Sequence, residues 1–208
     1  MLKKWFAYLL NKGERFDKKL SPYKEKLFAD VKDKIILEIG AGAGLNLRYY
    51  IGAKKVYLLE PNQYTYKYNL ERKIRFGIDV SILPSGAESI SLADHSVDIV
   101  TATFVLCSVQ NVNAVLKEVY RVLKPSGELI MLEHIAAESG WLKFLQRTMR
   151  SLWRKIADGC DCHRDTPTIL KNLGLFQPVN VEVKYDVPSA FLKPWLLGIW
   201  AKNGVHSS

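Results

Sequence analysis

The feature that most constrains the fold is a run of apolar, mostly β-branched residues that ends in a glycine-rich loop. Residues 34–39 read Lys-Ile-Ile-Leu-Glu-Ile, and Gly40-Ala41-Gly42-Ala43-Gly44 follows directly. A continuous apolar run of this kind is typical of a strand buried on both faces of a sheet. Glycines after such a strand allow a sharp turn and let the backbone approach a ligand closely. The sequence therefore predicts a strand, a ligand-binding loop and a helix in that order.

Four further apolar runs alternate with helical patterns. The predicted strands cover 56–60, 80–83, 97–101 and 128–133. The predicted helices between them cover 45–50, 64–73 and 112–123. This alternation predicts a parallel sheet, and the last two runs, 179–185 and 195–202, predict an antiparallel pair because no helical pattern separates them. The expected fold is α/β and Rossmann-like: a seven-stranded, mostly parallel sheet with an antiparallel C-terminal strand pair and helices on both faces.

The chain of 208 residues is expected to form a single domain, 1–208, with a sizeable hydrophobic core. An N-terminal helical cap covers 1–33, and a cofactor-binding core covers 34–136. An accessory helical segment, 139–174, and the C-terminal strand pair, 175–203, complete the predicted organisation.

Two acidic residues indicate which ligand the loop binds. Glu38 lies just before Gly40, and Glu60 ends the second predicted strand, directly before Pro61. A pyrophosphate would be repelled by such a carboxylate, whereas S-adenosylmethionine carries an α-amino group and a sulfonium centre. Glu60, about 20 residues past Gly40, is placed to accept both ribose hydroxyls. The alternatives are a simple glycine-rich turn for the loop and a helix-capping role for Glu60.

The adenine and the rest of the cofactor are expected to contact two more segments. Ser85-Gly86-Ala87-Glu88 follows the third strand, where the adenine edge would lie, although a plain turn is the alternative. Thr103-Phe104-Val105 follows the fourth strand at the carboxyl end of the sheet, where ligands of open α/β sheets bind. The residues predicted to bind S-adenosylmethionine are Glu38, Gly40, Ala41, Gly42, Gly44, Glu60, Pro61, Ala87, Glu88, Thr103, Phe104 and Val105.

These motifs resemble those of the class I S-adenosylmethionine-dependent methyltransferases. More narrowly, Val-Leu-Cys-Ser-Val at 105–109, Glu-His-Ile-Ala-Ala-Glu at 133–138 and Asp-Gly-Cys at 158–160 resemble the thiol S-methyltransferase branch of the methyltransferase-like proteins. The likeness extends from Lys3 nearly to Lys202, and it implies methylation of a small, apolar acceptor, with a thiol as the first choice. Membrane-associated members of that branch carry a hydrophobic anchor before a Lys-Lys-Trp-Phe element. Only Met1-Leu2 precedes this element here, so an anchor-less relative is expected.

The sequence contains fewer signals for the part of the site that binds the methyl acceptor. Methyl transfer needs alignment of donor and acceptor more than a catalytic triad, and a thiol is already partly ionised at neutral pH. His134, at the end of the fifth strand, is predicted to take a proton from the acceptor, the alternative being a packed histidine bonded to backbone. Cys107 and Tyr23 are predicted to contact the acceptor, and Trp5 and Phe6 to cover the cleft.

The three cysteines, Cys107, Cys160 and Cys162, are too few for a disulfide framework and indicate a reducing, cytoplasmic location. Cys160, Cys162 and His163 lie close in sequence but lack a fourth nearby ligand. This is a poor spacing for zinc, and no metal site is predicted.

The formal net charge of +9 is confined to two segments. Residues 1–34 contain ten Lys/Arg against five Asp/Glu, and residues 141–171 contain seven against three. Within 141–157 an apolar stripe is expected to pack on the sheet, while a basic stripe faces outward. The basic stripe consists of Lys143, Arg147, Arg150 and Arg154. Either it is a solubilising surface or it contacts an anionic membrane reversibly, which would make the protein peripheral to a membrane.

Other functions stay open at this stage. Within the methyltransferases, the acceptor could be a phospholipid head-group amine or a quinone-like lipid. From another class, a non-catalytic nucleic-acid-binding or regulatory protein could keep this fold. No nucleic acid is expected, because aromatic and basic residues are not interleaved on a predicted sheet face.

Overall fold

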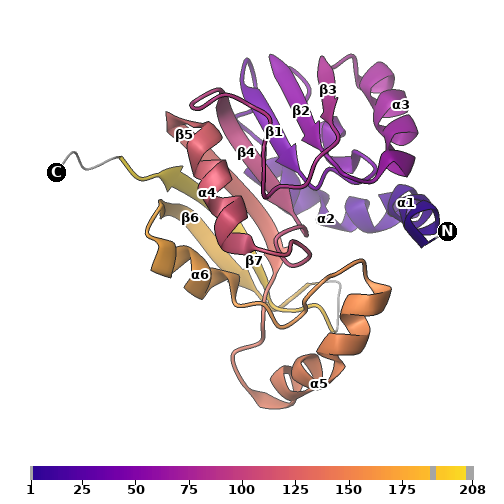
Figure 1. Cartoon of the computed structure of the whole chain (residues 1–208), viewed down its shortest axis with the longest axis vertical. Helices are drawn as coiled ribbons and strands as arrows, with labels where there is room; N and C mark the ends of the chain where they lie inside the picture. Colours follow the sequence, from indigo (N-terminus) through magenta and orange to yellow (C-terminus); the bar gives the residue numbers. More distant parts are fainter. Residues whose placement is uncertain (1, 188–190, 205–208) are drawn as a thin grey trace.

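The computed structural model describes residues 2–187 and 191–204, and its centre is a seven-stranded sheet (Figure 1). The strand order is β3-β2-β1-β4-β5-β7-β6, and β7 pairs antiparallel with both β5 and β6. The other pairings are parallel, so the predicted fold class is confirmed. The strands are β1 (Ile35–Ile39), β2 (Lys55–Leu59), β3 (Val80–Leu83), β4 (Val97–Thr103), β5 (Leu123–His134), β6 (Phe176–Lys184) and β7 (Trp195–Lys202).

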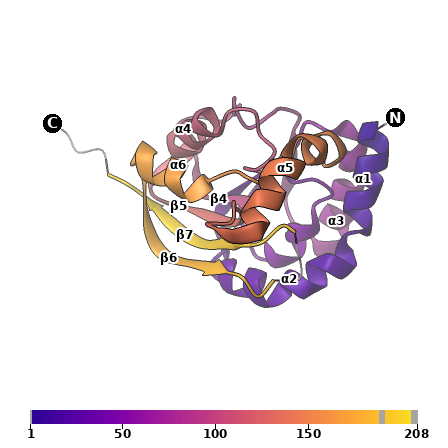
Figure 2. The same ribbon diagram turned by 90° about the horizontal axis from the view of Figure 1, so that it is seen from below.

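Helices cover both faces of the sheet (Figure 2). On one face, α4 and α6 bury apolar residues against Leu37 and Ile39 of β1. On the other face, α2 and the short η1 bury apolar residues against Ile36. Alternate β1 side chains thus enter opposite cores, as expected of a strand buried on both sides. The helices are α1 (Leu2–Lys12), α2 (Glu14–Leu27), η1 (Leu45–Tyr49), η2 (Gln63–Thr65), α3 (Tyr66–Phe76), α4 (Val112–Val122), α5 (Gly140–Ile156) and α6 (Thr166–Leu173).

Two predicted elements differ in detail. The helix expected over 45–50 is a short 3₁₀ segment, η1. The fifth strand starts at Leu123 rather than near Glu128, because Leu123 already pairs with Val97 before the register shifts. Residues 188–190, within the predicted C-terminal strand pair, and Met1 lie outside the described residues.

The prediction that the apolar stripe of α5 packs on the sheet is wrong. Its fully buried side chain is the polar Gln146, which accepts from the Ala137 amide and donates to the carbonyls of Phe191 and Lys193. These hydrogen bonds hold α5 beside the sheet's lower end (Figure 1). Of the predicted stripe, Leu152 and Ile156 are more than half exposed, and the neighbouring Trp141 and Phe144 are exposed at 74% and 70%.

The basic stripe of α5 also differs from the prediction at one position. Arg150 is half exposed, but its guanidinium donates three hydrogen bonds to the buried carboxylate of Asp161. Lys143, Arg147 and Arg154 are exposed as expected. Among residues 2–187 and 191–204, no helix is both long and apolar enough to cross a membrane.

Candidate active site

A cleft of about 750 Å³ lies at the carboxyl ends of β1, β2, β4 and β5. The glycine loop after β1 and Glu60 after β2 line one end of it. Phe104 and Cys107 after β4, together with His134 at the end of β5, line the other end. The parallel strands end at the same edge of the sheet, so residues far apart in sequence meet in this one cleft.

Gly40 makes the sharp turn at the bottom of the cleft. Its φ of +64° lies in the left-handed region, which favours glycine. A Cβ atom at this position would overlap the side chain of Val105, which follows β4. The loop can therefore pass this close to the β4 end only with glycine at position 40.

Glu60 braces the glycine loop. Its Oε2 accepts the backbone N–H of Gly42 at 2.7 Å, and its Oε1 accepts that of Asn62 at 2.8 Å. Burial raises the pKa of Glu60, while these two backbone N–H groups favour the charged form. Each carboxylate oxygen keeps a lone pair for another donor. Glu60 can thus hold the loop and still accept hydroxyl groups of a ligand.

Glu38 ends a buried polar chain that the sequence analysis missed. Lys24 of α2 donates to Asp17 and to Asn46, and the Asn46 amide donates to Glu38 Oε1 at 2.7 Å. The second oxygen of Glu38 is buried and has no hydrogen-bond partner among the described residues. Burial raises the pKa of Glu38 to about 8, against the opposing effects of Asn46 and Lys24. An unpartnered buried carboxyl oxygen in the cleft suits a cationic ligand group.

Ala87 and Glu88 line the cleft beyond Glu60. Glu88 Oε1 accepts the backbone N–H of Gln110 at 2.9 Å, which ties this segment to the start of the loop before α4. The segment is therefore held in place by a hydrogen bond to a distant part of the chain, which a plain turn would lack. Its contact with adenine stays a prediction.

Most of the predicted site residues are brought together by the fold. Gly44 and Tyr23 are the exceptions. Gly44 begins η1 behind the loop, and Tyr23 packs edge-on against Trp195 while its hydroxyl donates to the Asp186 carbonyl. The predicted residues that line the cleft are Glu38, Gly40, Ala41, Gly42, Glu60, Pro61, Ala87, Glu88, Thr103, Phe104, Val105, Cys107 and His134.

The N-terminal cap covers the cleft with only one of the two α1 residues that were predicted to do so, Phe6. Phe6, Leu9 and Leu10 of α1 line the cleft, whereas Trp5 is 56% exposed. Phe16 of α2 takes the place predicted for Tyr23. The spacing of Phe6, Leu9, Leu10 and Gly13 is the signal that identifies this face, since residues three, four and seven apart share one side of a helix.

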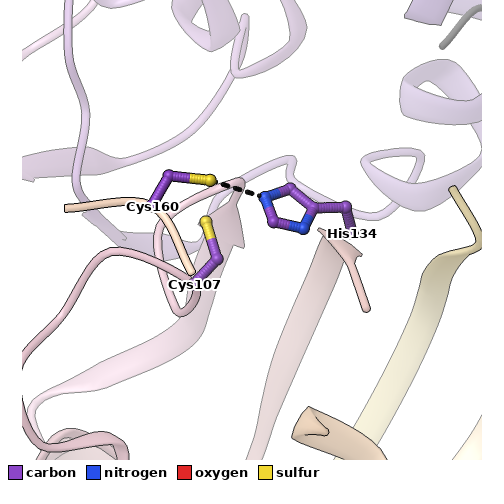
Figure 3. Close-up of side chains that lie close together, drawn as sticks. All are labelled: Cys107, His134 and Cys160. Carbon is purple, nitrogen blue, oxygen red and sulfur yellow. Dashed lines mark hydrogen bonds between the residues drawn. The ribbon is translucent and has the colours of Figure 1, made fainter. Parts of the chain in front are cut away.

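At the acceptor end, His134 meets two cysteines (Figure 3). Its Nε2 lies 3.0 Å from Cys160 Sγ, and its ring stacks on that of Phe104. The hydrogen bond to Cys107, followed by that to His134, lowers the pKa of Cys160 to about 5. The hydrogen bond to Cys160, together with burial, raises the pKa of Cys107. The partner of His134 is therefore a thiol, rather than the backbone group that the sequence left open. Cys160 was missed because it lies 26 residues from His134 and far from the loop after β4.

The sequence of this chain is similar to those of known methyltransferases. Its residues 37–131 match the methyltransferase domain family. Thiol S-methyltransferase TMT1A of Homo sapiens is 33% identical over 96% of this chain and 87% of that protein. Thiol S-methyltransferase TMT1B of Rattus norvegicus is 36% identical over 89% of this chain and 80% of that protein. This chain is a member of that methyltransferase family.

The same fold recurs in a solved methyltransferase structure. The 1,6-didemethyltoxoflavin-N1-methyltransferase of Burkholderia thailandensis, with S-adenosylhomocysteine bound, has a TM-score of 0.69. At 16% identity it covers 97% of this chain and 87% of its own, which shows the shared fold. The prediction of a class I, S-adenosylmethionine-dependent methyltransferase is confirmed.

The residues of this methyltransferase fit its cofactor, S-adenosylmethionine. The unpartnered Oε2 of Glu38 can receive the cationic α-amino group. The remaining lone pairs of Glu60 can accept the ribose hydroxyls. The loop residues Gly40, Ala41 and Gly42 line the same cleft and can contact the methionine end.

Proposed function

We propose that this methyltransferase acts on the sulfur of a small, apolar thiol. The observation that carries the proposal is the aromatic wall at the acceptor end of the cleft. The ring of Phe104 packs edge-on against Trp195 at 5.2 Å, and Phe16 lies within 6.5 Å of both. All three line the cleft beside Cys107 and His134. An apolar acceptor gains binding free energy from these aromatic side chains, because its apolar surface is removed from water when it contacts them.

The thiol assignment is supported by the relatives that are themselves named thiol S-methyltransferases. When bound, S-adenosylmethionine supplies a methyl group on an activated sulfonium centre. The protein's part is to hold the acceptor sulfur in line with that group and to keep water out. Phe6, Leu9 and Leu10 close the cleft from the N-terminal side. His134 is the group proposed to receive the thiol proton, and its contact with Cys160 fixes the orientation of the ring.

The direct test is methylation of a simple alkyl thiol with S-adenosylmethionine that carries a labelled methyl group. The expected product is the methyl thioether, while the matching alkyl alcohol and amine remain unmodified. Phe16→Ala should raise KM for the apolar thiol more than it lowers kcat, because it removes binding area without touching the reacting atoms. If thiols yield no product and an amine lipid does, the thiol proposal is wrong.

We also propose that the methyltransferase contacts an anionic membrane surface reversibly. Exposed aromatic side chains of α1 and α5 support this, namely Trp5, Tyr8, Trp141 and Phe144. Both helices border the cleft, since Phe6 and Trp153 line it. Exposed lysines and arginines accompany them, so apolar area and positive charge are available together.

A membrane-borne acceptor is the second candidate, favoured by the same exposed faces beside the cleft. A phospholipid head-group amine or a quinone-like lipid could reach the site from such a surface. Vesicles containing these lipids, added in place of the thiol, distinguish the candidates. Methyl incorporation into lipid with none into thiols would favour this alternative.

A further inference from the structure

Three metal-ligating side chains from distant parts of the chain meet at the acceptor end of the cleft. Cys107 follows β4, His134 is the last residue of β5, and Cys160 follows α5. All three are buried, and their ligand atoms lie within 4.8 Å of one another. Figure 3 shows both sulfur atoms and the imidazole turned toward a common region.

The spacing of these atoms is close to that of a tetrahedral zinc site. Zn–S bonds of about 2.3 Å and Zn–N bonds of about 2.0–2.1 Å place sulfur and nitrogen about 3.5 Å apart, and two sulfurs about 3.8 Å apart. In the structure His134 Nε2 lies 3.0 Å from Cys160 Sγ, and the remaining pairs lie within 4.8 Å. Shifts of roughly 1 Å or less, within the reach of side-chain rotation, would complete the geometry.

The chemistry of the cluster also fits a metal better than hydrogen bonding alone. Thiols are weak hydrogen-bond donors and acceptors, and the contacts of Cys107 Sγ with oxygen atoms are long, 3.6 Å to the Phe104 carbonyl and 3.5 Å to Ser108 Oγ. As thiolates and a neutral imidazole they are among the preferred ligands of Zn²⁺. The indole Nε1–H of Trp153 donates to Cys160 Sγ at 3.2 Å, a contact that would support a ligating thiolate from outside the coordination sphere.

We propose that Cys107, His134 and Cys160 form a binding site for one Zn²⁺ ion. Three protein ligands and an open fourth position are the arrangement of catalytic rather than structural zinc sites. Each of the three residues lines the cleft, so an ion and an acceptor could both reach the cluster from it. The local Cys160, Cys162 and His163 cluster does not make this site, because the Cys162 thiol donates instead to the Gln146 carbonyl.

The site would activate the acceptor, a step that rests on the proposed thiol function. With zinc bound, His134 Nε2 is a metal ligand, so a water molecule takes the thiol proton in place of His134. A thiol bound at the fourth position would lose its proton to a water molecule and remain as a metal-bound thiolate. Its sulfur lone pair would form the new carbon–sulfur bond while the methyl–sulfonium bond breaks. The products are the methyl thioether and S-adenosylhomocysteine, and the zinc ion is unchanged.

Metal binding can be measured without any acceptor. Reduced protein, freed of metal with a chelator, would be titrated with Zn²⁺ and separately with Co²⁺. We expect about one ion per chain, and Co²⁺ should show the visible bands of a tetrahedral site with thiolate charge-transfer absorption. Cys107→Ser and Cys160→Ser should each weaken Zn²⁺ binding at least about 10-fold, since a ligand is lost. Cys162→Ser is the matched control, because it removes a buried thiol from the same region, and it should bind as the unsubstituted protein does.

Binding of S-adenosylhomocysteine by each variant shows that it is folded. Failure of the reduced protein to bind either ion, or equal weakening by Cys162→Ser, would overturn the zinc site. A metal-free protein that methylates alkyl thiols at an undiminished rate would overturn the activating role and leave the proposed function standing. Stoichiometric Zn²⁺ binding without thiol methylation would overturn the proposed function and leave the metal site standing.

Discussion

The side-chain amide of Asn46 donates to Glu38 Oε1 at 2.7 Å, while the second oxygen of this cleft-lining carboxyl group is buried and has no hydrogen-bond partner among the described residues. Burial raises the pKa of Glu38 to about 8, which favours the protonated form in the free protein. A cationic ligand favours the ionised form. Ligand binding and the release of this proton are therefore linked.

The first prediction is proton release when S-adenosylhomocysteine, with its cationic α-amino group, binds at pH 7. Close to one proton should leave Glu38, so affinity should rise as the pH increases from 6 toward 8. Calorimetry in two buffers of different ionisation enthalpy measures the released proton. Glu38→Gln should abolish the buffer dependence, and Glu88→Gln should keep it. A binding enthalpy independent of buffer in the unsubstituted protein contradicts the assignment.

The second prediction concerns Glu60. Glu60→Ala removes the acceptor of the Gly42 and Asn62 amides and of the proposed ribose hydroxyls. We expect a loss of about 1.5–3 kcal/mol in S-adenosylhomocysteine binding, since the hydrogen bonds to this charged group disappear. That loss is roughly 10- to 150-fold in Kd by calorimetry. Glu71→Ala, at an exposed position of α3, is the control, and unchanged affinity in Glu60→Ala would show that the carboxylate is not used.

The third prediction separates backbone strain from close approach at the glycine loop. Gly40 and Gly77 have nearly the same φ, +64° and +65°, but a Cβ atom meets Val105 at Gly40 and nothing within 4 Å at Gly77. Gly77→Ala should therefore cost only the left-handed strain, about 1–2 kcal/mol of unfolding free energy. Gly40→Ala should cost more and also weaken S-adenosylhomocysteine binding.

Pairing Gly40→Ala with Val105→Ala tests the cause. The second substitution removes the two Cγ atoms of Val105, including the one nearest the new Cβ, but leaves Val105 Cβ at 2.7 Å, so only part of the lost stability should return. Denaturant unfolding of the single and double variants measures the coupling. Additive effects would mean that the two residues do not interact.

The fourth prediction tests the membrane surface by vesicle sedimentation. The protein should sediment with anionic but not neutral vesicles, and added salt should release it. Charge reversal of Lys143, Arg147 and Arg154 should abolish binding, since each cation contributes about 1 kcal/mol. The control reverses three exposed lysines outside α1 and α5, namely Lys54, Lys117 and Lys171. Membrane contact is contradicted if the protein stays in the supernatant at low salt. It is also contradicted if the control variant loses vesicle binding to the same extent.

Much of the fold follows from local patterns in the sequence. The continuous apolar run of β1 predicted a strand buried on both faces, and its side chains do enter two cores. Gly40 and Glu60 were placed correctly at the cleft because they directly follow strands whose carboxyl ends share one edge of a parallel sheet. A strand's period and its terminal residues are local properties, so they can be recognised without the tertiary structure.

The contacts between distant segments were decided by the tertiary structure alone. Sequence periodicity shows that α5 has an apolar stripe, but the tertiary structure buries the polar Gln146 and leaves Leu152 and Ile156 of that stripe more than half exposed. Likewise, the sequence singled out His134 and Cys160 separately but did not pair them, and they become a pair because β5 and the segment after α5 meet at the cleft. Local propensity determines which elements form, whereas the direction of each side chain in the packed molecule determines which chemical groups meet.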